Sequence, residues 1–126
     1  VGSEMCIRDS ADTIAQKMRA ADVLVFATPI YYYGMSGQMK TMLDRGNPLY
    51  ASDYAFREVY LLAAAAEEEE HTMDGAVNGL RGWLACFPKA RLAGTVFGGG
   101  VDVAGAIKEH PALQKAYEMG MAVSNG

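Results

Sequence analysis

Three short apolar runs alternate with segments of helical periodicity, and this alternation restricts the fold more than any other feature of the sequence. The runs are Val23–Ala27, Val59–Ala65 and Leu92–Phe97. The segments of helical character surround them at residues 12–20, 36–45, 72–87 and 111–123. Strands that alternate with helices are typical of a parallel β-sheet with crossover helices. The pattern therefore predicts an α/β fold.

The predicted sheet is small. Three strands are fewer than the roughly four to six of most sheets, so we expect an incomplete sheet. Val23–Ala27 is apolar at every position, which predicts a strand that helices cover on both faces. If one edge of this strand has no neighbour, it invites pairing with another chain. We therefore expect the isolated chain to be marginally stable, prone to aggregation or dependent on self-association.

Length and charge exclude several classes of protein. A chain of 126 residues fits a single domain. The formal net charge of −4 and the lack of a basic cluster argue against nucleic acid as a partner. No apolar run approaches the roughly 18–20 residues that span a bilayer. The two cysteines, Cys6 and Cys86, are too few for a disulfide framework, so we expect a cytoplasmic protein with reduced thiols.

The first ten residues resemble translated adapter sequence, and position 1 is not Met. We therefore interpret residues 1–10 as a candidate non-native leader. Residues 11–126 are assigned to one partial domain.

A ligand-facing loop is predicted directly after the first apolar run. The segment Thr28–Gly37 contains Pro29 and three consecutive tyrosines, and it leads into a helix. In open α/β sheets ligands bind at the edge where the strands end. Tyrosine rings have flat apolar faces with polar tips, which suit a planar aromatic ligand. The alternative is an ordinary strand-to-helix loop whose tyrosines cap the core.

Residues 21–33, with Met35–Lys40 and Asp44-Arg45, resemble the flavodoxin-like NAD(P)H-dependent FMN reductases, which include multimeric flavodoxins and iron–sulfur flavoproteins. The resemblance extends over roughly residues 12–123. It implies a three-layer sandwich around a parallel sheet of order 2-1-3-4-5, with FMN at the switch point between strands 1 and 3. On this mapping the chain holds strands 3, 4 and 5. The first strand and its phosphate-binding loop have no counterpart in it.

The resemblance also implies which residues face the flavin ring. Backbone N–H groups from Ile30 to Tyr33 would reach the pyrimidine edge, and one or more of the three tyrosines would pack against the ring. The loop Ala64–Glu68 borders the flavin in relatives. The expected contacts are Pro29, Ile30, Tyr31, Tyr32, Tyr33, Gly34, Ala65, Ala66 and Glu67. No catalytic side chain and no metal site are predicted.

Three functions stay open. The first is an FMN-dependent oxidoreductase that takes hydride from NAD(P)H and reduces a quinone-like or other small acceptor, as a homo-oligomer like many relatives. The second is a flavodoxin-type electron carrier. The third is a non-catalytic fragment that binds no flavin, because the phosphate loop is missing. Cys6 fits the end of a cysteine motif in iron–sulfur relatives, but one cysteine cannot hold a cluster that takes four thiolates, so we predict none.

Several further residues have simple structural interpretations. We expect the acidic run Glu67–Glu70 to precede a helix N-terminus, where negative charge is stabilised. Gly98–Gly100 is interpreted as a tight turn after a strand, although the resemblance would place it near the flavin rim or a subunit interface. Lys40 and Asp44 are spaced for an ion pair on one helix. We expect His71 and His110 on the surface, and Cys86 as a buried thiol within a helix.

Overall fold

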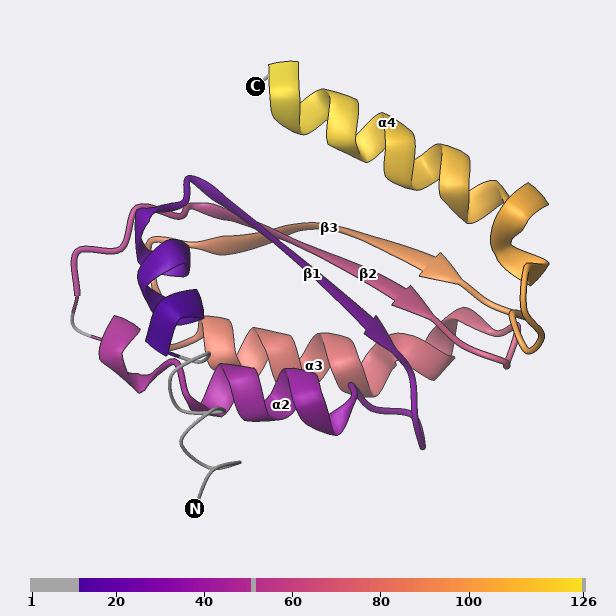
Figure 1. Ribbon diagram of the computed structural model, residues 1–126, viewed down its shortest axis with the longest axis horizontal. Coiled ribbons are helices and arrows are strands. Elements are labelled where there is room, and N and C mark those ends of the chain that lie inside the picture. The colour runs from indigo at the N-terminus through magenta and orange to yellow at the C-terminus, as the bar shows by residue number, and fades with distance from the viewer. Residues whose placement is uncertain (1–11, 51, 126) are drawn as a thin grey trace.

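The computed structural model describes residues 12–50 and 52–125. A helix over residues 12–20 comes first, followed by β1 (Val23–Pro29), α2 (Gly37–Asp44), β2 (Glu58–Ala64), α3 (Asp74–Leu84), β3 (Arg91–Gly98) and α4 (Pro111–Asn125). Short 3₁₀ turns lie at η1 (Asn47–Leu49), η2 (Glu70–Met73) and η3 (Ala106–Glu109). The strands are parallel in the order β1-β2-β3. Figure 1 shows α2 and α3 on one face of the sheet and α4 on the other.

The hydrophobic core lies between the sheet and the helices on the α2/α3 side. Every second residue of a strand points to this side, and the side chains of Leu24, Phe26, Val59 and Leu61 are buried here. An aromatic cluster closes the end where the strands begin. Its members, with ring centroids 4.5–6.2 Å apart, are Phe26, Tyr54, Phe56, Trp83 and Phe87.

The α2 helix forms as its sequence predicts. The Ser36 hydroxyl accepts a hydrogen bond from the Met39 amide at 3.2 Å, which makes Ser36 the N-cap. The expected ion pair is also present, with 2.6 Å between Lys40 Nζ and Asp44 Oδ1.

The helix expected over residues 72–87 is shorter. It begins with the η2 turn, and α3 ends at Leu84. As a result Cys86 lies in the turn after α3 and is exposed, so the expectation of a buried thiol was wrong. The next residue, Phe87, points into the core instead and is almost completely buried.

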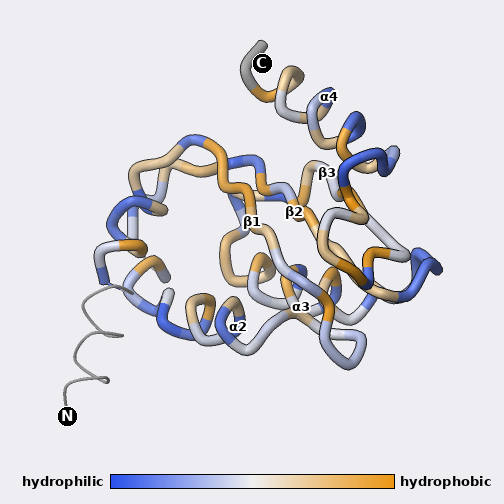
Figure 2. The backbone as a smooth tube through the Cα atoms, turned by 45° about the vertical axis from the view of Figure 1, so that its right-hand side comes forward, coloured by the Kyte–Doolittle hydropathy of each residue, from blue (hydrophilic) through white to orange (hydrophobic). Residues whose placement is uncertain are grey.

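The β1 strand is covered on one face only, which corrects the expectation of a doubly buried strand. Its burial alternates, and Val25 is 54% exposed although the segment is strongly hydrophobic (Figure 2). The physical reason is the position of α4, which packs over β3 and not over β1 (Figure 1). Within the described residues no helix covers this face of β1, and no strand pairs with its outer edge.

Candidate functional site at the ends of the strands

A strained two-residue turn follows β1. The Tyr31 amide donates to the Gly34 carbonyl and the Gly34 amide donates to the Tyr31 carbonyl, both at 3.0 Å. Between them, Tyr32 and Tyr33 have φ angles of 49° and 64°. This left-handed region suits glycine, and bulky residues adopt it at a cost of about 1–3 kcal/mol each. Such strain is often found at ligand sites.

The three tyrosines project away from the core. Their side chains in sequence order are 61%, 102% and 61% exposed. The alternative interpretation, in which they cap the core, is therefore wrong. Their aromatic faces are available to a ligand.

Two glycines of α3 allow the turn to lie against this helix. A Cβ atom on Gly75 would collide with the carbonyl oxygen of Tyr33, and one on Gly79 would lie 2.8 Å from Cε of Met35. Because the atom that a Gly75 Cβ would meet is backbone, the turn can lie here only over a helix without a side chain at Gly75, whereas at Gly79 the flexible end of Met35 could move aside. Sequence reasoning missed both glycines. The available signal was glycine inside a predicted helix, where it lowers stability unless packing needs it.

Hydrogen bonds fix both ends of the loop after β1. The Thr28 hydroxyl donates to the Pro29 carbonyl at 2.7 Å and accepts from the Ser36 amide at 2.9 Å. The Ile30 amide donates to the Ala64 carbonyl at 2.8 Å, which holds the loop beside the end of β2.

The loops after β2 and β3 form one hydrogen-bonded unit. The Ala65 amide donates to Gly98, the Gly100 amide to Glu67, and the Val101 amide to Ala65, at 2.8–3.0 Å. Gly100 has a φ of 72°, as expected for a tight turn with unusual backbone angles. The glycine run therefore packs against the backbone of the loop after β2 and does not form an open anion-binding loop.

His110 joins this unit to α4. Its Nδ1 accepts from the Ala112 amide at 3.0 Å, and its Nε2 lies 2.8 Å from the Gly99 carbonyl oxygen. The side chain is partly buried, so the expectation of a surface histidine was wrong for His110. It was correct for His71, which is exposed beside Glu69.

The backbone amides without a hydrogen-bond partner in the protein determine which ligand groups the site can bind. The amides of Ile30 and Tyr31 are already used within the protein. Among the described residues, the amides of Tyr32, Tyr33, Ala66 and Glu67 have no hydrogen-bond partner. These donors follow the ends of two neighbouring strands, and those of Tyr32 and Tyr33 belong to the loop with the exposed aromatic rings. They fit the polar edge of a flat heteroaromatic group such as a flavin, which accepts hydrogen bonds along one side.

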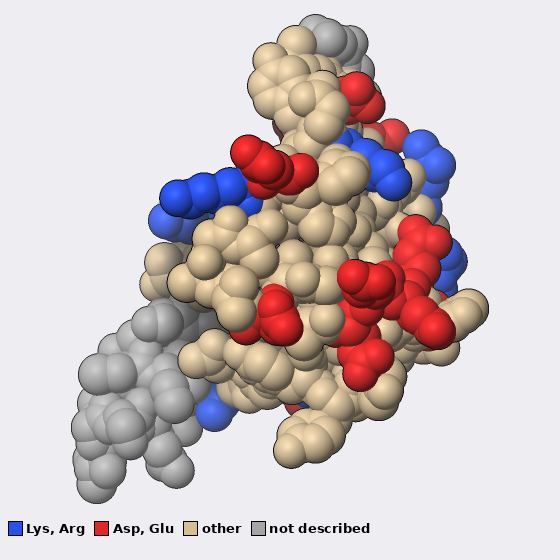
Figure 3. Space-filling model, turned by 90° about the vertical axis from the view of Figure 1, so that its right-hand side faces the viewer, with Lys and Arg blue, Asp and Glu red and all other residues tan. Residues whose placement is uncertain are grey.

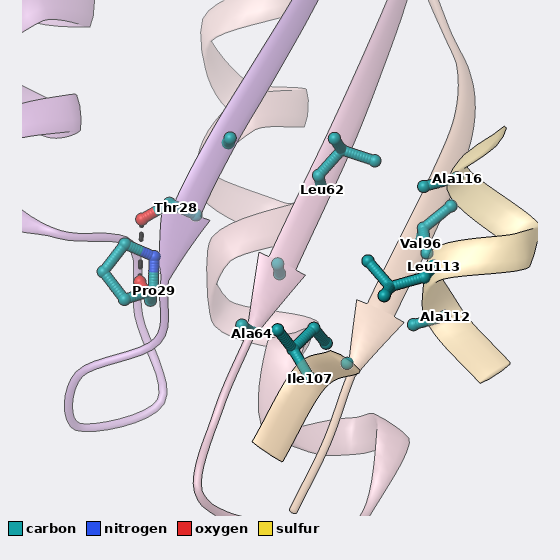
Figure 4. Close-up of a pocket in the computed structure, with 12 residues that line it drawn as sticks. Thr28, Pro29, Leu62, Ala64, Val96, Ile107, Ala112, Leu113 and Ala116 are labelled. Carbon is teal, nitrogen blue, oxygen red and sulfur yellow. Dashed lines mark hydrogen bonds between the residues drawn. The ribbon is translucent and has the colours of Figure 1, made fainter. Parts of the chain in front are cut away.

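An apolar groove adjoins these loops on the open face of the sheet. It has a volume of about 390 Å³ and lies between β1 and α4 (Figure 4). Of the residues predicted to contact the ligand, only Pro29 lines it. The lining residues are mostly small or aliphatic: Ala27, Thr28, Pro29, Leu62, Ala63, Ala64, Val96, Gly98, Ile107, Ala112, Leu113 and Ala116.

The charge at this end of the molecule is mostly negative. Figure 3 looks onto the end of the sheet where the strands finish and shows several acidic side chains there. The run Glu67–Glu70 is exposed and precedes α3, as expected. In the part of the chain that the structure describes, no three His, Cys, Asp or Glu side chains are arranged to hold a metal ion. Likewise, none of the described helices is long and apolar enough to cross a membrane.

Comparison with known families decides the assignment. Residues 3–103 match the family described as NADPH-dependent FMN reductase. The chain belongs to this family. The description of the NADPH-dependent FMN reductases names both FMN and NADPH, which confirms for the family the cofactor and co-substrate that the sequence resemblance implied.

Individual relatives of the chain among the FMN reductases are distant and longer. YwqN of Bacillus subtilis, named as a candidate NAD(P)H-dependent FMN-containing oxidoreductase, is 29% identical over an alignment of 69 residues, and the match covers 48% of this chain and 38% of YwqN. The iron–sulfur flavoprotein MJ1083 of Methanocaldococcus jannaschii is 38% identical over an alignment of 56 residues, and the match covers 39% of this chain and 29% of that protein. The matches thus span well under half of these relatives.

Solved structures confirm the flavodoxin-like α/β fold. The Trp repressor binding protein of Bacillus subtilis superposes with a TM-score of 0.68 and 24% identity, over 84% of this chain and 72% of that one. The NAD(P)H:quinone oxidoreductase of Methanothermobacter marburgensis gives a TM-score of 0.58 and 16% identity, over 92% of this chain and 64% of that one. The numbering of the three strands as 3, 4 and 5 of five stays a prediction, and so do the flavin contacts.

Proposed function

We propose that this chain supplies the part of a flavin site that faces the isoalloxazine ring of FMN, in an oxidoreductase that uses NAD(P)H. One observation carries the proposal: backbone amides without a protein partner follow both β1 and β2, and the loop after β1 also carries three exposed tyrosines. The edge where parallel strands end is the usual ligand position in open α/β sheets. Family membership supports the same cofactor.

Each group of the site has a defined task in this proposal. FMN supplies hydride and electron transfer when it is bound, so the protein has to bind, orient and tune it. The Tyr32 and Tyr33 amides would hold the polar edge of the ring, and their partial positive charge would stabilise negative charge there. Ala66 and Glu67 offer a second pair of donors. The aromatic rings exclude water from one side of the ligand.

The assignment of contacts follows the two loops. The residues proposed to border the ring are Pro29, Ile30, Tyr31, Tyr32, Tyr33, Gly34, Ala65, Ala66 and Glu67. The amides of Ile30, Tyr31, Gly34 and Ala65 are occupied within the protein, so these four residues contribute shape rather than hydrogen bonds.

The acceptor proposed is a quinone-like or other small molecule. A solved structural neighbour is named as a quinone oxidoreductase, which supports this choice for the chain. The flavodoxin-type electron carrier stays an alternative, and so does a fragment that binds no flavin. Turnover separates the first two, because a carrier transfers electrons without a pocket for a small acceptor.

Titration with two flavins tests the proposed site. Riboflavin contains the same ring as FMN but no phosphate. If the chain holds the ring and not the phosphate, quenching of flavin fluorescence will report dissociation constants for riboflavin and FMN within about threefold of each other. Tyr32→Ala and Tyr33→Ala should weaken both, since stacking on an aromatic ring contributes about 0.5–1.5 kcal/mol. Tyr50→Ala is the matched control, because Tyr50 is about as exposed as Tyr33 but lies outside the site.

The outcomes distinguish the three functions. Failure of both flavins to bind would support the non-catalytic fragment. Much tighter binding of FMN would reveal a phosphate site that the proposal lacks. If both flavins bind, oxidation of NADPH with a quinone, compared with oxidation without it, separates a reductase from an electron carrier.

We also propose that the protein self-associates through β1. Among the described residues no strand pairs with its outer edge, and before its last residue, Pro29, the strand has none of the charges, prolines or bulges that usually protect edges. Two copies that pair antiparallel about a two-fold axis through Phe26 would place Val25 opposite Ala27. Both residues belong to the open face, so the pairing keeps apolar side chains together.

A further inference from the structure

The ring of His110 uses both of its nitrogens. Nδ1 accepts the hydrogen bond from the Ala112 amide, so this nitrogen carries no proton. The proton then resides on Nε2, which donates to the Gly99 carbonyl oxygen at 2.8 Å. A neutral imidazole with this tautomer satisfies both partners at once. The residue thus connects the first turn of α4 to the loop after β3.

Gly99 in turn lies directly against the loop after β2. A Cβ atom on Gly99 would lie 2.8 Å from the carbonyl oxygens of both Glu67 and Glu68, and 2.7 Å from the Phe97 ring. No side chain fits into this space. The peptide group that accepts the hydrogen bond from His110 is therefore in backbone contact with the β2 loop.

Two further hydrogen bonds join the loop after β3 to the loop after β2. The Gly100 amide donates to the Glu67 carbonyl at 2.9 Å, and the Val101 amide donates to the Ala65 carbonyl at 2.8 Å. The bonded carbonyls belong to residues 65 and 67. The amides of Ala66 and Glu67, two of the four unpaired donors of the candidate site, lie within this same segment.

We propose that His110 is a positioning residue, which acts through Gly99 to fix the direction of the Ala66 and Glu67 amides. Its own anchor is α4, because His110 is the residue before the helix and Ala112 is buried against β3. The proposal rests on the proposed flavin site for its functional meaning. The mechanical connection itself is independent of whether a flavin binds.

Two substitutions separate the connection from helix capping. In His110→Asn the short side chain still caps α4, since Asn is a favoured N-cap residue, but it does not reach the Gly99 carbonyl. In His110→Ala both interactions are lost. His71→Asn is the matched control, because the exposed His71 ring lies 3.9 Å from the Glu69 side chain and does not hydrogen-bond to the Gly99 carbonyl or the Ala112 amide.

Amide hydrogen exchange in the full chain measures the connection directly. In His110→Asn, protection at Gly100 and Val101 should fall by about tenfold, which corresponds to one lost hydrogen bond. Protection at Ala112 should stay near its original value. In His110→Ala all three amides should lose protection. Unchanged protection of Gly100 and Val101 in His110→Asn would overturn the proposal.

Flavin titration of the same variants distinguishes the two proposals. If the parent chain binds riboflavin, His110→Asn should bind it several-fold more weakly, and His71→Asn should not. If riboflavin affinity is unchanged in His110→Asn, the positioning role is refuted. If the parent chain binds no flavin, the proposed function fails, and hydrogen exchange alone still decides whether His110 holds the β2 loop.

Discussion

At the scale of single residues, the missing side chain of Gly75 decides where the turn after β1 can lie. The Tyr33 carbonyl oxygen occupies the space of a Cβ atom at this position. We expect Gly75→Ala to destabilise the fold by about 1–3 kcal/mol, because an overpacked site forces the backbone to shift. The same change should weaken flavin binding, since Tyr33 belongs to the displaced turn. Urea unfolding and flavin titration measure the two effects.

The same helix offers a matched control for this substitution. A Cβ atom on Gly82 meets nothing within 4 Å. Gly82→Ala should therefore stabilise the protein by about 0.5–1 kcal/mol, as expected for glycine replaced by alanine inside a helix. If both variants destabilise equally, helix geometry rather than contact with Tyr33 explains the result.

Individual conformations were the part of the site that the sequence predicted least. Pro29 and three tyrosines at the end of a strand indicated a ligand-facing loop, and its position at the edge of the sheet is confirmed. The left-handed backbone of Tyr32 and Tyr33 was not predictable, because tyrosine has no preference for it. It depends on the distant Gly75. The role of His110 likewise depends on the Gly99 carbonyl, eleven positions away.

At the scale of elements, the apolar runs predicted all three strands to within two residues at each end. Continuous hydrophobicity bounded by polar or turn residues identifies such strands well. Helix ends were harder. The segment over residues 72–87 divides into η2, α3 and a terminal turn, and this division placed Cys86 outside the core.

The surroundings of Tyr60 also raise the pKa of its hydroxyl. Its hydroxyl donates to Glu58 Oε2 at 3.1 Å, and Gly94 of β3 lies under its ring. Burial, together with the hydrogen bond and negative charge of Glu58, raises the pKa of Tyr60 above its usual 10.0. As pH rises above about 10, an unfolded chain loses this proton before the folded protein does. Folding stability therefore falls as pH rises through the raised pKa.

The substitution Tyr60→Phe tests this effect. It removes the ionisable group, so the loss of stability between about pH 9 and about pH 11 should be smaller than in the parent chain. Tyr50→Phe, at an exposed tyrosine, is the control. Urea midpoints across this range provide the measurement. An identical slope in the parent chain and in Tyr60→Phe would contradict the assignment.

At the scale of the whole molecule, the two faces of the sheet are unequal. One face is covered by α2, α3 and the helix over residues 12–20, and the other carries α4 above β3 alone (Figure 1). The sequence predicted helices on both faces from the hydrophobicity of β1. The hydrophobicity of a strand indicates that both of its faces favour burial, but it does not identify the helix, strand or second chain that buries each face. The exposed Val25 is the consequence.

The free edge of β1 makes self-association the expected behaviour of the purified chain. Sedimentation should show association that increases with protein concentration. Val25→Lys places a charge on the open face next to the edge, where charged side chains oppose strand pairing, and it should shift the protein to monomer. Val103→Lys is the matched control, because Val103 is 67% exposed but lies in a loop away from β1. It should associate like the parent chain. A stable, cooperatively folding monomer at all concentrations would refute the proposal, and equal association of both lysine variants would move the interface away from β1.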